Sequence, residues 1–144
     1  MTGPDDTRTI DFSWELPYPP STVWRALTEP DLLGRWLMAT DMRPAVGERF
    51  TFRQEPTPWW DGIVKCEVLD LEPPERLRYS WRSGGGASAV DTVVTWTLTA
   101  TPSGGTRLAL VQSGFAPGAA FEGAKQGWER MAAELRVLLE GIAG

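Results

Sequence analysis

The side chains that most often carry out catalysis are scarce in this sequence. Its 144 residues include no histidine, which removes the commonest acid/base group at neutral pH and the commonest metal ligand. The single cysteine, Cys66, alternates with Val64 and Val68, so we expect its thiol to pack in an apolar strand face without an activating base. Outward strand faces are expected to carry the carboxylates of Asp11, Glu15, Glu67 and Asp91. The sequence therefore predicts no catalytic residue, no metal site and no cofactor.

Aromatic side chains are the unusual chemical feature of the chain. Eight tryptophans occur, namely Trp14, Trp24, Trp36, Trp59, Trp60, Trp81, Trp96 and Trp128. Each ring is large and rigid, so eight of them indicate either a bulky core or a cavity with aromatic walls. Uncharged polar groups on Tyr79, Thr92 and Gln112 could orient a bound molecule, and a structural hydrogen bond is the alternative for each.

The elements that must position these residues are first of all β-strands. Six segments alternate apolar and polar residues with the period of a strand: 9–16, 49–53, 64–71, 76–82, 90–100 and 106–112. Within 64–71 the apolar phase slips by one at Leu69, which predicts a β-bulge. The turn at residues 102–105 favours a hairpin, and the sheet is predicted to be antiparallel.

Three further segments have helical features. Pro20 and Pro30 can each begin a short helix directly after the first strand. From Phe121 to Ile142 the apolar residues recur every three or four positions, which predicts one long amphipathic helix. The resulting order is one strand, two short helices, five strands and a long helix, which is an α+β arrangement.

Composition narrows the classes of protein and partner. The net charge of −5 makes nucleic acid an unexpected partner, since phosphate binding usually needs a basic excess. No apolar run is long enough for a membrane span, the N-terminus does not resemble a signal peptide, and one cysteine cannot form an internal disulfide. We expect a cytoplasmic protein with a single domain over residues 1–144 and a flexible tail at 1–8.

Several short segments connect this pattern to a known family. They are Pro20-Ser-Thr-Val-Trp-Arg-Ala-Leu-Thr-Glu-Pro30, Leu33-Gly-Arg-Trp36, Val46-Gly-Glu-Arg-Phe50, Leu71-Glu-Pro-Pro-Glu-Arg-Leu77, Tyr79-Ser-Trp81, Gly105-Thr-Arg-Leu-Ala-Leu110, Ser113-Gly-Phe115 and Gly127-Trp128. Over residues 9–140 the chain resembles the family of proteins related to the activator of the heat-shock protein 90 ATPase. That family lies in the START-like superfamily (SRPBCC) of birch-pollen allergens and lipid-transfer proteins. The resemblance implies a helix-grip fold, in which a six-stranded curved antiparallel sheet wraps around the long C-terminal helix.

Two departures from the family pattern affect the expected function. Relatives often have a histidine before the Ser-Gly-Phe segment, where this chain has Gln112, which does not titrate near neutral pH. The eukaryotic activator that names the family also has a separate N-terminal domain, and we expect none in this chain. A chaperone partner is therefore not expected.

The resemblance implies a cavity between the sheet and the C-terminal helix. The residues expected to bind a ligand there are Trp36, Phe52, Tyr79, Trp81, Trp96, Gln112 and Trp128. Simple core packing is the alternative for each of them. The function predicted from these residues is a non-catalytic protein that binds a small hydrophobic or aromatic molecule.

Two other functions stay open at this point. An enzyme similar to polyketide cyclases and aromatases would use Tyr79 and Gln112 as its polar groups. A protein-interaction module or chaperone regulator would use Trp59 and Trp60, which lie in a proline-flanked loop and could also form a gate or part of the core. A homodimer is a further possibility.

Overall fold

The computed structural model describes residues 8–58, 60–84, 90–116 and 118–143, which form seven strands and three helices. Strand β1 (Arg8–Leu16) is followed by helices α1 (Pro20–Thr28) and α2 (Pro30–Trp36). The next strands are β2 (Ala39–Thr40), β3 (Arg49–Arg53), β4 (Ile63–Glu72), β5 (Arg76–Ser83), β6 (Val90–Ala100) and β7 (Thr106–Phe115). Helix α3 (Ala119–Ala143) follows them. The predicted α+β class is confirmed, with one strand more between the short helices and α3 than the predicted order has.

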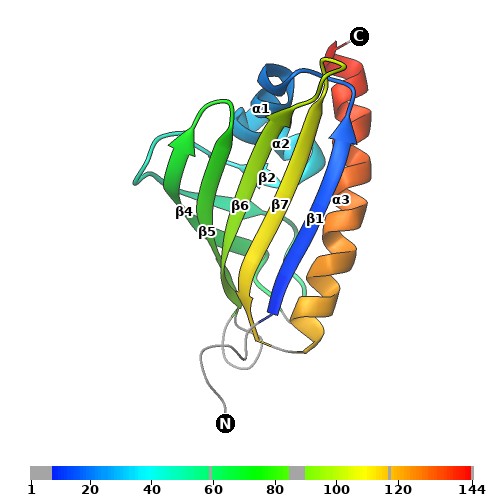
Figure 1. The fold of residues 1–144 in the computed structure, drawn as a ribbon. Helices are drawn as coiled ribbons and strands as arrows, with labels where there is room; N and C mark the ends of the chain where they lie inside the picture. The colour runs from blue at the N-terminus through cyan, green and yellow to red at the C-terminus, as the bar shows by residue number, and fades with distance from the viewer. Residues whose placement is uncertain (1–7, 59, 85–89, 117, 144) are drawn as a thin grey trace.

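The strands form a curved sheet in the order β1-β7-β6-β5-β4-β3-β2, and every neighbouring pair is antiparallel. Figure 1 shows α3 running along this sheet, with α1 and α2 behind its upper part. The predicted antiparallel sheet with a long helix against it is thus confirmed. Of the predicted tail, residues 1–7 lie outside the described residues, and Arg8 is the first residue of β1.

The described sheet has one strand more than the six that were predicted. The additional strand, β2, has only two residues, in which Ala39 lies opposite Arg53 and Thr40 lies opposite Phe52. Two residues give no readable alternation, so the prediction of six strands missed it. The predicted bulge is confirmed, because the β4–β5 register shifts between Val68 and Asp70.

Proline and tryptophan define the two short helices. Pro20 and Pro30 are the first helical residues, where a missing backbone N–H costs no hydrogen bond. The Trp36 indole Nε1 donates to the carbonyl oxygen of Ala26 at 2.8 Å and so ties the end of α2 to α1. Both helices contact α3, so the three helices form one layer against the sheet.

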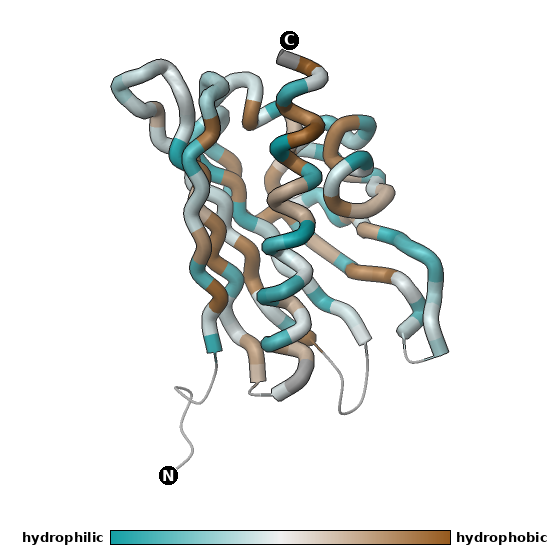
Figure 2. Tube along the Cα trace, turned by 90° about the vertical axis from the view of Figure 1, so that its right-hand side faces the viewer, coloured by the Kyte–Doolittle hydropathy of each residue, from teal (hydrophilic) through white to brown (hydrophobic). Residues whose placement is uncertain are grey.

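Helix α3 packs through an apolar stripe. Trp128, Leu135 and Leu139 are buried, whereas Glu129 and Glu134 on the same helix are exposed. Figure 2 shows the resulting alternation of hydrophobic and hydrophilic residues along the helix. None of the described helices is long and apolar enough to cross a membrane.

Candidate functional site

A continuous cluster of aromatic rings connects the helices to the sheet. Trp96 on β6 makes edge contacts with Trp36 at the end of α2 and with Trp128 on α3, at centroid distances of 5.9 and 5.5 Å. Trp128 in turn contacts Trp81 on β5 at 5.5 Å, and Trp81 contacts Phe52 on β3 at 5.3 Å. Each edge or tilted pair adds a small stabilisation beyond burial, so the cluster fixes the position of α3 on the sheet.

Tyr79 belongs to this cluster, where its ring contacts Phe52 at a centroid distance of 6.1 Å. Its hydroxyl accepts a hydrogen bond from Trp96 Nε1 at 3.0 Å, and its side chain is 1% exposed. Burial raises the pKa of the Tyr79 hydroxyl well above its ordinary value, and the hydrogen bond from Trp96 opposes this only in part. Tyr79 therefore stays neutral and serves as a partner for Trp96.

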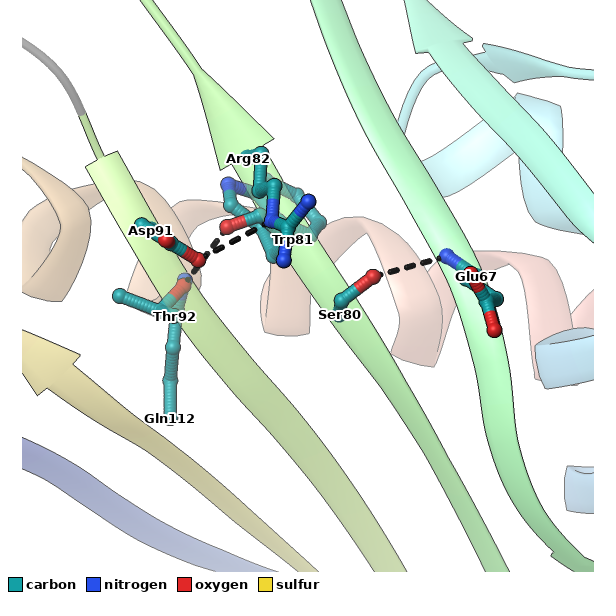
Figure 3. Close-up of polar contacts among 7 residues, drawn as sticks. All are labelled: Glu67, Ser80, Trp81, Arg82, Asp91, Thr92 and Gln112. Atoms are coloured by element: carbon teal, nitrogen blue, oxygen red, sulfur yellow. Dashed lines mark hydrogen bonds and ion pairs between the residues drawn. The ribbon is translucent and has the colours of Figure 1, made fainter.

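Gln112 occupies the centre of a buried hydrogen-bond chain. The Trp128 indole Nε1 donates to Gln112 Oε1 at 2.7 Å, and Gln112 Nε2 donates to Thr92 Oγ1 at 2.9 Å. The Thr92 hydroxyl then donates to the carbonyl oxygen of Trp81 at 3.1 Å. Figure 3 shows Gln112, Thr92 and Trp81 in this order across neighbouring strands.

The direction of this chain is determined by its members. An indole N–H only donates, so the oxygen of the Gln112 amide must face Trp128 and its nitrogen must face Thr92. The Thr92 hydroxyl oxygen accepts that hydrogen bond, and the Thr92 O–H donates to the carbonyl oxygen of Trp81. One amide hydrogen of Gln112 is not used by these bonds.

A cavity of about 340 Å³ lies beside the cluster, under the N-terminal half of α3. Its wall consists of Met38, Trp60, Val64, Trp81, Ser83, Gly84, Val90, Gln112, Phe115, Ala120, Ala124, Trp128 and Met131. Gly84 and Ala120 are exposed, so the cavity reaches the surface between Gly84, directly after β5, and the start of α3. No charged side chain is among these described wall residues.

The structure places the seven candidate ligand-binding residues in two groups. Trp81, Gln112 and Trp128 belong to the cavity wall. The others, Trp36, Phe52, Tyr79 and Trp96, are buried in the aromatic cluster and are not among the wall residues. Thr92 is also absent from the wall and acts within the hydrogen-bond chain.

Trp60, from the loop between β3 and β4, is a further wall residue. Reciprocal backbone bonds with Thr57 hold it, at 2.8 and 3.3 Å. The loop closes tightly at Gly62, where φ is +79° and a Cβ would collide with the backbone carbonyl of Gln54. Trp59, its predicted companion, lies outside the described residues.

Several wall residues are not among the seven predicted ligand-binding residues. Val64, Ala124 and Met131 follow the strand or helix period, so their inward position was readable from the pattern. Met38 and Trp60 lie in irregular segments, where no period says which way a side chain points. The packing of the whole fold, and not a local sequence pattern, therefore places these two residues at the cavity.

Few of the described side chains in this region could act as catalytic groups. Burial raises the pKa of the Cys66 thiol far above its ordinary value, so the nucleophilic thiolate does not form near neutral pH. Within the described residues, no three acidic or cysteine side chains gather in a way that could hold a metal ion. A larger hollow of about 590 Å³ lies at the opposite end of the strands, between the end of β1 and the β6–β7 turn, and its lining includes no aromatic residue.

Comparison with known proteins agrees with this architecture. The family model described as Activator of Hsp90 ATPase homolog 1-like protein matches residues 17–140. Among solved structures, protein MLL2253 from Mesorhizobium loti is 42% identical with a TM-score of 0.85, over 92% of this chain and 97% of that one. Curated proteins provide no match.

Two other similar structures are more distant. CalU16 from Micromonospora echinospora is 25% identical with a TM-score of 0.77, over 92% of this chain and 76% of its own. DynU16, from the dynemicin biosynthetic locus, is 27% identical with a TM-score of 0.76. The likeness to DynU16 covers 92% of this chain but only 47% of DynU16.

Proposed function

Because this chain belongs to the family of Activator of Hsp90 ATPase homolog 1-like proteins, we propose that it is a non-catalytic binding protein for a small hydrophobic or aromatic molecule. The observation that carries the proposal is the cavity of about 340 Å³ under α3, with Trp60, Trp81 and Trp128 in its wall. Cavities of this size, with apolar walls and few polar groups, are typical of small-molecule sites.

The expected affinity is moderate. A ligand of about 20 non-hydrogen atoms, at roughly −0.3 kcal/mol per atom, binds with about −6 kcal/mol, which is a Kd in the tens of micromolar. Such binding requires no catalytic group. It requires only that the aromatic and apolar surface of the ligand transfers from water into the cavity.

Ala124 provides a direct test, because it lies in the cavity wall on α3. We expect Ala124→Leu to place extra carbons in the cavity and weaken binding at least about fivefold, since overfilling a packed space typically costs about 1–3 kcal/mol. The measurement is an NMR titration with a panel of neutral aromatic and fatty-acyl compounds.

Ala133 gives the matched control, because it is an exposed alanine on the same helix. Ala133→Leu makes the same chemical change away from the cavity and should leave every Kd as it is. If no compound of the panel binds the wild-type protein, or if Ala124→Leu binds as well as Ala133→Leu, the cavity is not the binding site.

A catalytic role is the second candidate, and the likeness to DynU16 from a biosynthetic locus favours it. Gln112 would then be the polar group that touches the substrate, because it belongs to the wall whereas Tyr79 does not. Mass spectrometry of each bound compound after long incubation separates the two functions. Unchanged compound supports binding alone, and a product that disappears with Gln112→Ala supports an enzyme.

A further inference from the structure

The polar side-chain groups of the cavity wall are three indoles, one amide and one hydroxyl. The Trp128 indole donates to the amide oxygen of Gln112, and these two side chains are 2% and 1% exposed, so both are enclosed by protein. The Trp60 indole nitrogen is buried, so a ligand in the open cavity does not reach it. The polar groups that remain belong to Trp81 and Ser83 on β5.

Ser83 lies on the face of the sheet that borders the cavity. Its cross-strand partners are Val64 on β4 and Val90 on β6, and both of these are wall residues. Residues opposite each other in neighbouring strands have their side chains on the same face. Trp81 precedes Ser83 by two positions and therefore shares this face as well.

The Ser83 hydroxyl is accessible and has no hydrogen-bond partner within the described part of the chain. Of the described side chains, only Trp60 has a polar atom that is both buried and unpartnered, so the unpartnered hydroxyl of Ser83 and indole N–H of Trp81 are not buried. A hydroxyl both donates and accepts, whereas an indole nitrogen only donates. Ser83 also precedes the exposed Gly84, so its hydroxyl stands at the entrance of the cavity.

The surroundings of Ser83 favour neither sign of charge. No charged side chain is among the described wall residues of the cavity. A neighbouring polar hollow of about 210 Å³ shares Ser83 with the cavity, and its lining includes two cations, Lys65 and Arg82, and two anions, Asp61 and Asp91. A charged group on a ligand would lose hydration in the cavity without an opposite charge to replace it, at a large cost. A neutral polar group avoids this cost.

We infer that the ligand is a neutral molecule with an apolar aromatic body and one polar group at its end, such as a phenolic hydroxyl, which forms a hydrogen bond with Ser83. The body lies against the rings of Trp81 and Trp128, and the polar end stays at the entrance. Ser83 thus determines which way round the ligand binds. This inference rests on the proposed binding function and adds the class and orientation of the ligand to it.

Two neutral probes of similar size isolate the contribution of the hydroxyl. In 2-naphthol an O–H replaces the methyl group of 2-methylnaphthalene. Because the two compounds differ in hydration, each is compared between protein variants and not with the other. Ser83→Ala should raise the Kd of 2-naphthol about fivefold, the effect of one net hydrogen bond, and change the Kd of 2-methylnaphthalene less than about twofold. An NMR titration measures each Kd.

Ser13→Ala is the matched control, because Ser13 is an exposed serine on β1 that is not a wall residue. This variant should leave the Kd of both compounds as it is. A third probe, 2-naphthoate, tests the charge of the ligand. Its carboxylate should make it bind the wild-type protein more weakly than 2-naphthol does.

The outcomes separate the inference from the binding function. An unchanged Kd of 2-naphthol in Ser83→Ala, an equal loss for both neutral compounds, or tighter binding of 2-naphthoate than of 2-naphthol would each overturn the inference while binding in the cavity stands. If none of the three probes binds, the inference falls, and the binding function falls with it when no compound of the wider panel binds either. An unchanged melting temperature and Kd of 2-methylnaphthalene show that the Ser83→Ala protein is folded.

Discussion

At the scale of single residues, Gln112 has the most exacting position in the molecule. It is 1% exposed, and it accepts from one side chain and donates to another within the buried chain. Glutamine suits this place because its amide has both an acceptor and a donor at fixed spacing. A histidine at this position would add a group that titrates near neutral pH.

Replacement of Gln112 by leucine tests the structural part of this role. Gln112→Leu removes the partners of Trp128 Nε1 and Thr92 Oγ1 inside the core, so we expect the free energy of unfolding to fall by about 1–3 kcal/mol. Urea denaturation measures this change. Gln126→Leu, at an exposed position of α3, is the control and should stay within about 0.5 kcal/mol of wild type.

Equal stability of the two leucine variants would contradict this account of Gln112. It would mean that water reaches Trp128 and Thr92 from the cavity and replaces the amide. The same comparison therefore reports how dry that part of the cavity wall is.

At the scale of elements, the part of α3 that covers the cavity contains residues of low helix propensity. Gly123 and Gly127 lie in its N-terminal half, and glycine is among the poorest helix formers. The wall residues Ala120 and Ala124 belong to this same half. The element that covers the cavity thus has low intrinsic helix propensity.

Gly123→Ala should strengthen this segment. A Cβ at Gly123 meets no atom within 4 Å, so we expect the free energy of unfolding to rise by about 0.5–1 kcal/mol. Thermal denaturation provides the measurement. Gly104→Ala is the matched control, because its Cβ also has open space but its φ is +87°, so this variant should lose stability.

A loss of stability in Gly123→Ala would show that the helix is not the native state of this segment. A gain in Gly104→Ala would show that the turn relaxes. In either case the backbone conformation described for that glycine would be incorrect.

The sequence predicted the elements well wherever a period could be read. The alternation in six segments, the phase slip at Leu69 and the spacing from Phe121 to Ile142 are local patterns, and the structure confirms each. β2 is too short to have a period, and its two residues form a strand because β3 lies beside them. Pairing with β3, and not a local pattern, therefore determines that β2 is a strand.

The candidate site was less predictable for the same reason. Periods showed that Trp81, Trp96 and Gln112 point inward, but they could not say which of them border a cavity and which are covered by other side chains. Trp96 is covered because Trp36 and Trp128 both contact its ring. Which rings remain at the wall depends on how α2 and α3 pack, and that is absent from any local pattern.

At the scale of the whole molecule, the core contains two titratable groups that burial keeps neutral. Cys66 and Tyr79 are 4% and 1% exposed, and burial raises the pKa of both above their ordinary values of about 8.5 and 10. The folded protein keeps these protons at a pH where the unfolded chain has lost them. Their contribution to stability is therefore complete below about pH 8.5 and is lost as pH rises.

Alkaline titration of stability checks this expectation. Above about pH 9 the free energy of unfolding should fall by up to about 1.4 kcal/mol per pH unit from Cys66, with a second, similar slope from Tyr79 above about pH 10. Urea denaturation between pH 7 and pH 11 gives the profile. Cys66→Ala should flatten the first part of the curve, and Tyr79→Phe should flatten the second.

A profile that is the same in Cys66→Ala and in wild type would contradict a buried, neutral thiol. A curve that rises above pH 9 would contradict the sign of both shifts. The starting stability of each variant will differ from wild type, so the slopes and not the absolute values are compared.

The pairing of β1 with β7 has a consequence for the order of folding. Strands β3 to β7 each pair with a strand close by in the chain, whereas Phe12 lies opposite Leu110 and Trp14 lies opposite Leu108. Contacts between distant parts of a chain carry a large loop-closure cost, so they slow folding and form after local ones. We expect the β3–β7 meander to assemble first, with β1 waiting for β7. During synthesis on the ribosome, β1 thus emerges before the strands of the meander and pairs after they have formed.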